Sequence, residues 1–243
     1  MKSVQLSLAC VVPVYNEAEI LEKAITLLVS TLKRQQIDSN WQGIIASNGS
    51  TDQTDEIGRK LEKSLTPHVK LIECSQKGKG QALRQAFRQV SARRYLYIDV
   101  DLPCRLSDIS VLLGTLDGGA DLVTSRRIGH RPPMRKLMTS GLMLINRVLF
   151  GISITDSHCP VKALSPRAAE VIVRDTQQTS WYIDTELVVL CAARGLSQME
   201  QPVHWVEKRF PNRESKVNIW KVSVLALYSL SQIWNHRRKL LHL

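Results

Sequence analysis

The 243-residue chain lacks the features that identify several large classes of protein. Its five cysteines are odd in number, scattered and free of any CxxC spacing, which argues against a disulfide framework or a zinc site and favours a reducing, cytosolic setting. The N-terminus moves directly into a strand-like run, without the long apolar core and cleavage site of a signal peptide. Internal repeats, low-complexity tracts and Pro/Gly/Ser linkers are also missing, so no domain boundary is marked.

Two common nucleotide-binding motifs are absent as well. Residues 77–81, Lys-Gly-Lys-Gly-Gln, lack the four-residue spacer of a P-loop and its Ser or Thr after the lysine, and no GxGxxG follows the first apolar run. The sequence therefore does not favour a P-loop ATPase or a dinucleotide-binding protein. Gly78 and Gly80 still permit a tight turn before a helix N-terminus, with two lysines nearby, which suits an anion. A solvated loop with two surface lysines is the alternative.

Composition favours one large α/β domain with an anionic partner. With 44% hydrophobic residues, the chain can bury a full core. Lys and Arg number 33 against 22 Asp and Glu, a formal charge of +11. This balance fits nucleic acid, a membrane surface or phosphorylated substrates, and charge alone does not choose among them.

Strand-like and helix-like segments alternate along the first half of the chain. We expect strands over residues 6–14, 43–47, 69–74, 95–100 and 121–125, and helices over 16–33, 52–64, 80–92 and 137–150. This alternation predicts βαβ units and a mostly parallel central sheet flanked by helices. We divide the chain into a domain over 1–216, with halves 1–125 and 126–216, and an amphipathic tail over 217–243.

Residues 95–101, Tyr-Leu-Tyr-Ile-Asp-Val-Asp, are an apolar, β-prone run that leads into two carboxylates. Ligands of open α/β sheets bind at the carboxyl ends of such strands, so Asp99 and Asp101 are expected at the rim of the sheet. On an extended backbone their side chains share one side, which suits a divalent cation whose remaining ligands are water and phosphate oxygens. A diphosphate substrate is thus implied. A turn or a helix cap is the alternative.

Several segments together resemble one family. Residues 11–17 (Val-Val-Pro-Val-Tyr-Asn-Glu), 48–52 (Asn-Gly-Ser-Thr-Asp), 78–80 and 99–101 stand in the order of the family 2 glycosyltransferases of the GT-A fold, which is Rossmann-like. Residues 124–127, 154–159, 181–187 and 213–216 resemble the polyprenyl-phosphate sugar synthases, particularly the dolichyl-phosphate glucosyltransferases and their mannosyl relatives. The resemblance covers roughly residues 8–216. It implies transfer of one sugar, with inversion, from a nucleotide diphosphate donor to a lipid phosphate.

The resemblance also implies the donor side of the site. Pro13, Tyr15 and Glu17 are expected to enclose the nucleobase and ribose, with Tyr15 available for stacking and Glu17 as a hydrogen-bond acceptor. Asp101 is the expected main ligand of Mg²⁺ or Mn²⁺, and Asp99 lies near the ribose or the metal. That ion neutralises the departing nucleotide. The nucleotide-sugar contacts implied in addition are Asn48, Asp52 and Lys79.

Two positions depart from the family pattern. Ser47 and Asn48 stand where the family commonly has two aspartates before Gly-Ser, so an amide replaces a carboxylate often aimed at the base. An amide can both donate and accept hydrogen bonds, so Asn48 does not distinguish a uracil from a guanine base. The sugar donor is therefore a UDP-sugar or a GDP-sugar, with a weak preference for UDP from the glucosyltransferase resemblance. His158 stands where that branch often carries Gln, which affects the contacts to the donor sugar.

A basic segment explains part of the positive charge. Guanidinium groups grip phosphate oxygens with two hydrogen bonds, and the arginine-rich segment 126–136 follows directly after a predicted strand. A solvated basic loop is the alternative for many of these residues. By match to the family, the contacts to the donor diphosphate or acceptor phosphate are Arg126, Arg135, Arg213, Ser215 and Lys216.

Two further acids follow a Trp-Tyr pair. If the backbone is extended here, Asp184 and Glu186 share one side and are candidates to orient sugar hydroxyls or to assist as a general base. If Asp184 instead begins a helix over residues 185–194, it is an N-cap. A phosphate acceptor is already anionic near neutral pH and needs no strong base.

Apolar segments in the second half point to a membrane surface. The segment 137–154 carries Asn146 and Arg147 in its middle, and the apolar run 222–234 falls short of the roughly 20 residues of a spanning helix. Trp220, Tyr228 and Trp234 suit the headgroup region, and the basic residues 236–239 suit anionic lipid. We expect peripheral attachment to the cytosolic face of a membrane. An ordinary amphipathic helix that packs on the domain or on a partner subunit is the alternative.

The sequence therefore predicts a GT-A-type glycosyltransferase that makes a polyprenyl-phosphate sugar, without a nucleic acid partner. A same-fold alternative transfers sugar to a hydroxyl of a glycan or small molecule, and then Asp184 or Glu186 has to serve as base. From other classes, a basic nucleic-acid-binding α/β protein and a non-catalytic nucleotide-sugar sensor remain open.

Overall fold

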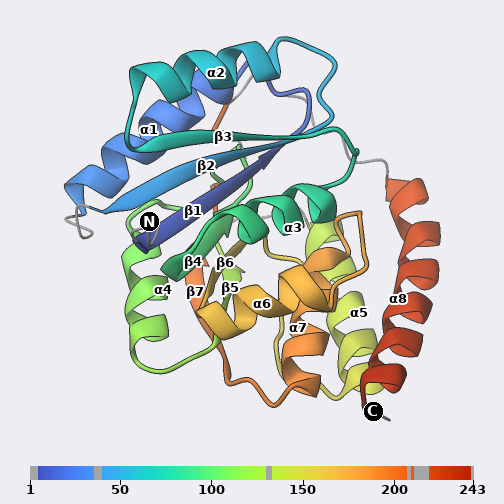
Figure 1. Ribbon diagram of the computed structural model, residues 1–243. Helices are drawn as coiled ribbons and strands as arrows, with labels where there is room; N and C mark the ends of the chain where they lie inside the picture. Colours follow the sequence, from blue (N-terminus) through green and yellow to red (C-terminus); the bar gives the residue numbers. More distant parts are fainter. Residues whose placement is uncertain (1–4, 36–39, 130–132, 207–208, 211–218, 242–243) are drawn as a thin grey trace.

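The computed structural model describes residues 5–35, 40–129, 133–206, 209–210 and 219–241. Within these ranges the chain forms seven strands and eight helices (Figure 1). The strands are β1 (Leu6–Val14), β2 (Trp41–Asn48), β3 (Val69–Cys74), β4 (Ala92–Ile98), β5 (Leu122–Ile128), β6 (Val161–Leu164) and β7 (Gln198–His204). The helices are α1 (Leu21–Arg34), α2 (Thr54–Ser64), α3 (Lys79–Gln89), α4 (Asp108–Asp117), α5 (Pro133–Phe150), α6 (Pro166–Arg174), α7 (Ile183–Ala193) and α8 (Ile219–Leu241).

The seven strands form one sheet in the order β3-β2-β1-β4-β6-β5-β7. Strands β1 to β4 pair in parallel, and β5 pairs in parallel with β7. The short β6 runs antiparallel to both of its neighbours, β4 and β5. The predicted mostly parallel α/β fold is confirmed. The sequence did not predict β6. A strand of four residues is too short for the alternation of side chains to be recognised, and a lysine interrupts its apolar residues.

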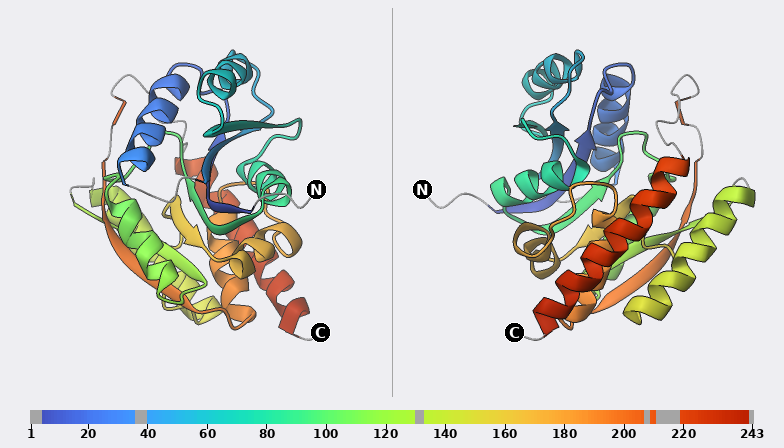
Figure 2. Two further views of the ribbon diagram at one scale, coloured as in Figure 1. Left: turned by 60° about the vertical axis from the view of Figure 1, so that its left-hand side comes forward. Right: turned by 90° about the vertical axis from the view of Figure 1, so that its right-hand side faces the viewer.

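Helices cover both faces of this sheet (Figures 1 and 2). Successive side chains of β1 point to opposite faces, so that Ala9 and Val11 join the core under α3, α6 and α7, whereas Leu8, Cys10 and Val12 join the core under α1 and α4. Both sets are fully buried. Burial on two sides is the reason why the strands are continuous apolar runs rather than alternating ones.

Several predicted boundaries differ from the structure by a few residues, and two of the differences lie at the predicted site. The first helix begins at Leu21 rather than at Asn16, because Asn16 has a left-handed φ of 52° and a turn at Glu17 precedes the helix. The fourth strand ends at Ile98, so Asp99 and Asp101 lie in the following turn and not on extended backbone. Both differences fall where the chain leaves a strand at the carboxyl edge of the sheet.

The C-terminal helix α8 lies next to α5 on one side of the molecule (Figure 2, right). The rings of Phe150 on α5 and Trp234 on α8 are 6.0 Å apart, and Leu230 and Ile233 of α8 are buried in the main core. The predicted C-terminal helix is thus present and packs on the domain. Among the residues that the structure describes, no helix has the length and apolar content to cross a membrane.

We expect Leu96→Ala to lower the free energy of unfolding by about 2–5 kcal/mol, because Leu96 is fully buried in the central strand β4 and the change leaves a cavity. Leu137→Ala on α5, where the side chain is 67% exposed, is the matched control and should change stability by less than about 0.5 kcal/mol. Urea denaturation measures both. Equal losses at the two positions would contradict this account of the core.

Candidate active site

The loops after β1 and β2 are joined by hydrogen bonds. Asn16 accepts a hydrogen bond from the backbone N of Thr51 at 2.7 Å, and the backbone N of Glu17 donates to Oγ1 of Thr54 at 2.8 Å. The carboxylate of Asp52 accepts from the backbone N of Thr54 at 2.9 Å and of Ala18 at 3.2 Å. Each loop therefore fixes the other. Asp52 serves this contact, and its assignment to the nucleotide sugar stays a prediction.

Tyr15 and Asn48, predicted to contact the donor, meet the turn before α3. Nζ of Lys77 donates to the Tyr15 hydroxyl at 2.8 Å and lies 4.2 Å from the centroid of its ring. Asn48 is buried, and its Oδ1 accepts from the backbone N of Gly78 at 3.3 Å. Pro13 is buried near the end of β1. The ammonium of Lys77 thus already lies over the Tyr15 ring, which is predicted to stack on a base.

Asp99 and Asp101 lie in a tight turn. The backbone N of Leu102 donates to the carbonyl of Asp99 at 2.9 Å, and Leu102 has a φ of 49°. The expectation that both carboxylates share one side of an extended strand is wrong, because the chain turns directly after Ile98. Both acids nevertheless stand at the carboxyl edge of the central strand. The guanidinium of Arg209 donates to the carbonyls of Leu102 at 2.9 Å and Cys104 at 2.6 Å, and these hydrogen bonds stabilise the turn.

A buried cluster of charges lies beneath this turn. Nζ of Lys79 is 3.0 Å from Oδ1 of Asp99 and 2.9 Å from Oδ2 of Asp184. Nζ of Lys162 is 3.3 Å from Oδ1 of Asp184, and the hydroxyl of Tyr97 donates to the same oxygen at 2.6 Å. The lysine and Asp184 side chains are at most 7% exposed. The cluster thus joins the first acid of the turn to the interior of the domain.

The cluster determines the charge of its members. Burial alone would raise the pKa of Asp184, but the charges of Lys162 and Lys79 and the hydrogen bond from Tyr97 outweigh it and hold the pKa at about 2. For Lys79, burial opposes the charge, but the carboxylates of Asp184 and Asp99 outweigh it and raise the pKa above its usual range. Near neutral pH both groups are therefore ionised, and Asp184 is a weak proton acceptor.

Asp184 and Glu186 point in different directions. Both belong to the first turn of α7, whose N-cap is Tyr182. Of the two alternatives the extended backbone is thus wrong and a helix is present, but Asp184 lies inside the helix and is not its cap. Residues two apart on a helix do not face each other. Glu186 accepts hydrogen bonds from the backbone N of Gln177 and Gln178 instead, away from the buried cluster.

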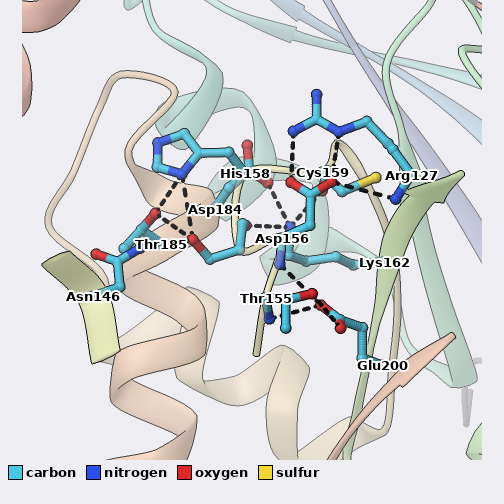
Figure 3. A network of polar contacts seen from close by, with 11 residues as sticks. Arg127, Asn146, Thr155, Asp156, His158, Cys159, Lys162, Asp184, Thr185 and Glu200 are labelled. Carbon is cyan, nitrogen blue, oxygen red and sulfur yellow. Dashed lines mark hydrogen bonds and ion pairs between the residues drawn. The ribbon is translucent and has the colours of Figure 1, made fainter. Parts of the chain in front are cut away.

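The strand predicted to end at residue 125 continues to Ile128, so Arg126 and Arg127 of the basic segment lie on β5 itself, and their contacts differ. The side chain of Arg126 is half exposed and lies 3.8 Å from Glu200. Arg127 is paired with Asp156 through two hydrogen bonds, at 2.6 and 2.5 Å (Figure 3). Its guanidinium also lies over the Trp205 ring, 5.0 Å from the centroid. Arg127 thus forms a structural ion pair, whereas the assignment of Arg126 to a phosphate stays a prediction. The side chain of Arg135 and the residues Arg213, Ser215 and Lys216 lie outside the described part of the chain, so their roles stay predictions.

His158 ends a chain of hydrogen bonds that starts on α5. Nδ2 of Asn146 donates to Oγ of Ser157 at 3.0 Å, Ser157 lies 3.1 Å from Oγ1 of Thr185, and Thr185 lies 2.7 Å from Nδ1 of His158 (Figure 3). Each hydroxyl can donate or accept, so the direction of the bonds between Ser157, Thr185 and His158 follows the tautomer of the imidazole. Burial lowers the pKa of His158 to about 4. The imidazole is therefore neutral near pH 7.

Comparison with known proteins identifies the family. The sequence model of Glycosyl transferase family 2 matches residues 9–160, more than half of the chain. The chain belongs to this family. The match includes the loops after β1 and β2, the turn before α3 and the Asp99–Asp101 turn, which are the parts brought together at the carboxyl edge of the sheet.

Curated relatives agree with this assignment. The chain is 26% identical over 220 residues to the glycosyltransferase AglD of Haloferax volcanii, a match that covers 88% of this chain and 35% of AglD. It is 29% identical over 227 residues to the dolichyl-phosphate beta-glucosyltransferase of Saccharomyces cerevisiae, covering 84% of this chain and 68% of the yeast protein. The chain therefore spans about a third of the length of one relative and about two thirds of the other.

Solved structures share the fold of this family 2 chain. Glucosyl-3-phosphoglycerate synthase from Mycobacterium tuberculosis, in complex with Mn²⁺, UDP and phosphoglyceric acid, superposes with a TM-score of 0.71 at 16% identity. The match covers 96% of this chain and 78% of that chain. A second structure of the synthase, with UDP alone, gives a TM-score of 0.69 at 17% identity. These likenesses confirm the GT-A-type fold.

Sequence reasoning missed two members of the buried cluster of this family 2 site. Lys162 is fully buried on β6, and Tyr97 is buried on β4. A single lysine inside the apolar run 159–164 is the signal that points to Lys162, because a lone charge in a buried strand requires a partner. For Tyr97 no signal exists, since a tyrosine in a strand is ordinary core.

We expect Asp184→Asn to lower the free energy of unfolding at pH 7 by about 3–5 kcal/mol, because it leaves two buried ammonium groups without their shared carboxylate. The folded pKa of Asp184, about 2, lies below its ordinary value of 3.8. Its contribution is therefore complete above about pH 5 and disappears as the pH falls towards 2. Urea denaturation at several pH values should show the wild-type advantage shrinking over this window.

Asp117→Asn is the control for this test. Asp117 pairs with Arg94 at 3.0 Å, but its side chain is 55% exposed, so the change should cost less than about 1 kcal/mol. A gap between wild type and Asp184→Asn that stays constant from pH 7 to pH 3 would contradict the proposed ionisation of the cluster.

Proposed function

We propose that the chain transfers a hexose, glucose or mannose, from a nucleoside diphosphate sugar to a polyprenyl phosphate of the dolichyl type, with inversion at the anomeric carbon. Membership in family 2 and the relatives named dolichyl-phosphate beta-glucosyltransferase support this reaction. UDP is preferred over GDP, since the neighbouring synthase structures contain UDP. The buried amide of Asn48 suits either base.

The contact of Asp184 with two buried ammonium groups, Lys79 and Lys162, is the observation that carries the choice of acceptor. With a pKa of about 2 and two ammonium partners, this carboxylate is a poor general base near neutral pH. Glu186, the other predicted base, is directed at the backbone of residues 177–178. A phosphate oxygen is already anionic at this pH and needs no base, whereas a hydroxyl acceptor does. This contrast favours a lipid phosphate over a glycan hydroxyl.

A divalent cation, Mg²⁺ or Mn²⁺, belongs to this proposal, with Asp101 as the main protein ligand and Asp99 beside it. Among the described residues, no group of three or more His, Cys, Asp or Glu side chains is arranged to hold a metal. One or two carboxylates nevertheless fit these ions, which take water and phosphate oxygens as their other ligands. A bound ion would neutralise the leaving diphosphate. The chain itself adds the ammonium of Lys79, 3.0 Å from Asp99.

We expect nucleoside diphosphate release and a charged glycolipid when the protein is incubated with a panel of UDP- and GDP-sugars, Mg²⁺ or Mn²⁺ and a short polyprenyl phosphate. Asp101→Ala should reduce turnover by about 10²–10³-fold, since it removes the expected cation ligand. The exposed Asp117→Ala is its control. Absence of release with every donor would overturn the enzymatic proposal, and transfer to hydroxyl acceptors alone would favour the same-fold alternative.

We further propose peripheral attachment to the cytosolic face of a membrane through α5 and α8. Leu137, Leu144 and Val148 of α5 are 67%, 60% and 74% exposed, and Tyr228 of α8 is 62% exposed. The two helices lie side by side (Figure 2, right), and α8 carries Arg238 and Lys239 in its last turn. Apolar side chains beside a basic cluster suit an anionic lipid surface. This position would bring the site to a lipid-linked acceptor.

We expect the double variant Leu144→Asp/Val148→Asp to reduce binding to vesicles that contain anionic lipid about tenfold or more, because two buried apolar contacts with the bilayer are lost. Flotation of vesicles with bound protein measures this. Val111→Asp on α4, which is also exposed at 52%, is the control and should bind as the wild type does. Equal binding of all three proteins would contradict attachment through α5.

A further inference from the structure

Glu186 is a buried charge that the proposed reaction does not use. Its side chain is 1% exposed, and its carboxylate accepts hydrogen bonds from the backbone N of Gln177 at 3.0 Å and of Gln178 at 2.8 Å. Nδ1 of His236, on α8, lies 3.3 Å from the same carboxylate. A buried carboxylate with these partners holds the backbone of residues 177–178 firmly, because hydrogen bonds to an ionised acceptor are the strong ones.

The other side of this loop packs on the turn that begins α3. The backbone N of Gly80 donates to the carbonyl of Thr179 at 2.9 Å. A Cβ at Gly80 would lie 2.0 Å from the carbonyl oxygen of Gln178, and one at Gly78 would lie 2.5 Å from that of Thr179. Gly78 also has a φ of 134°. Both glycines are therefore required by this backbone contact, which explains the Gly-Lys-Gly segment.

The residue between the two glycines is Lys79. Its ammonium contacts Asp99 at the mouth of the site and Asp184 beneath it. Because the turn has almost no clearance against residues 178–179, the position of that loop determines the position of Lys79. Arg84 of α3 fastens the loop further by donating to the carbonyls of Thr176 and Gln178 at 3.2 and 3.0 Å.

The loop also contacts α8 through side chains. Nε2 of Gln178 donates to Oε1 of Gln232 at 2.8 Å, beside the contact between Glu186 and His236. A polar cavity of about 340 Å³ lies between the loop and this part of α8. The polar contacts supplement the buried Leu230 and Ile233 of α8, so that the loop is held between α8 on one side and the glycine turn on the other.

We propose that Glu186 is a positioning residue for the donor site: through residues 177–179 it holds the glycine turn that presents Lys79 to Asp99, and His236 extends this support to α8. The inference deepens the proposed function and rests on it, since the nucleotide diphosphate is assigned to the Asp99–Asp101 turn. Glu186 acts through the backbone and does not touch the reacting atoms. Its loss therefore affects donor binding more than the chemical step.

The test compares donor kinetics of Glu186→Gln with those of the wild type. The amide is nearly isosteric but places N–H donors against the donating backbone of residues 177–178, so the loop shifts. We expect the KM for the donor sugar nucleotide to rise about tenfold while kcat changes by less than about threefold. Titration of UDP with Mn²⁺ by calorimetry should show the same loss of affinity. Glu170→Gln, an exposed residue paired with Arg174 on α6, is the matched control.

His236→Gln provides a second variant with little risk to the fold, since it changes only the α8 side of the contact. We expect a smaller rise in donor KM, about threefold, and a less than multiplicative effect when it is combined with Glu186→Gln. Circular dichroism and urea denaturation check folding of every variant.

The outcomes separate this inference from the proposed function. Wild-type protein without turnover, but with UDP–Mn²⁺ affinity that Glu186→Gln weakens, would overturn the transfer reaction and retain the positioning role. If the wild type shows turnover and both Glu186→Gln and His236→Gln keep its donor KM and UDP affinity, the positioning role is overturned. A fall in the stability of these variants would not change that conclusion. A fall in kcat alone for Glu186→Gln would also overturn it, because that result belongs to a residue in contact with the reacting atoms.

Discussion

The ion cluster around Asp184 is the contact on which the arrangement of the site depends. Asp184 comes from α7, its partners Lys79 and Lys162 come from α3 and β6, and Tyr97 comes from β4. Charges this deeply buried are tolerated only in pairs with good geometry, so each element is held in a narrow range of positions relative to the others. The cluster thus joins the parallel half of the sheet to the half that contains the antiparallel β6.

The cluster also influences the chemistry available above it. It keeps Asp184 ionised and weakly basic, and it places a positive charge beside Asp99 at the edge of the sheet. A site of this kind is suited to a substrate that brings negative charge and to an acceptor that needs no deprotonation. The interactions that stabilise the fold and the electrostatics of the proposed reaction therefore come from the same residues.

Much of the fold and part of the site could be predicted from sequence. The strands β1 and β3 have the predicted bounds, because two-sided burial produces apolar runs that are visible in the chain itself. The direction of side chains was less predictable. Asp184 and Glu186 were expected on one side, but α7 begins at Ile183 and sends them to different partners, Lys79 in one case and the backbone of residues 177–178 in the other. Helix boundaries depend on tertiary packing more than on local propensity.

By itself the sequence determined the α/β class, the location of Asp99 and Asp101 after a buried strand, and membership in family 2, because strand periodicity and short motifs are local properties of the chain. Only the tertiary structure decided that Lys79 pairs with Asp184, that Lys162 completes the cluster, and that Gly80 packs against the carbonyl of Gln178. These contacts join residues from about twenty to more than a hundred positions apart. Their geometry depends on how sheet and helices pack, which no local pattern records.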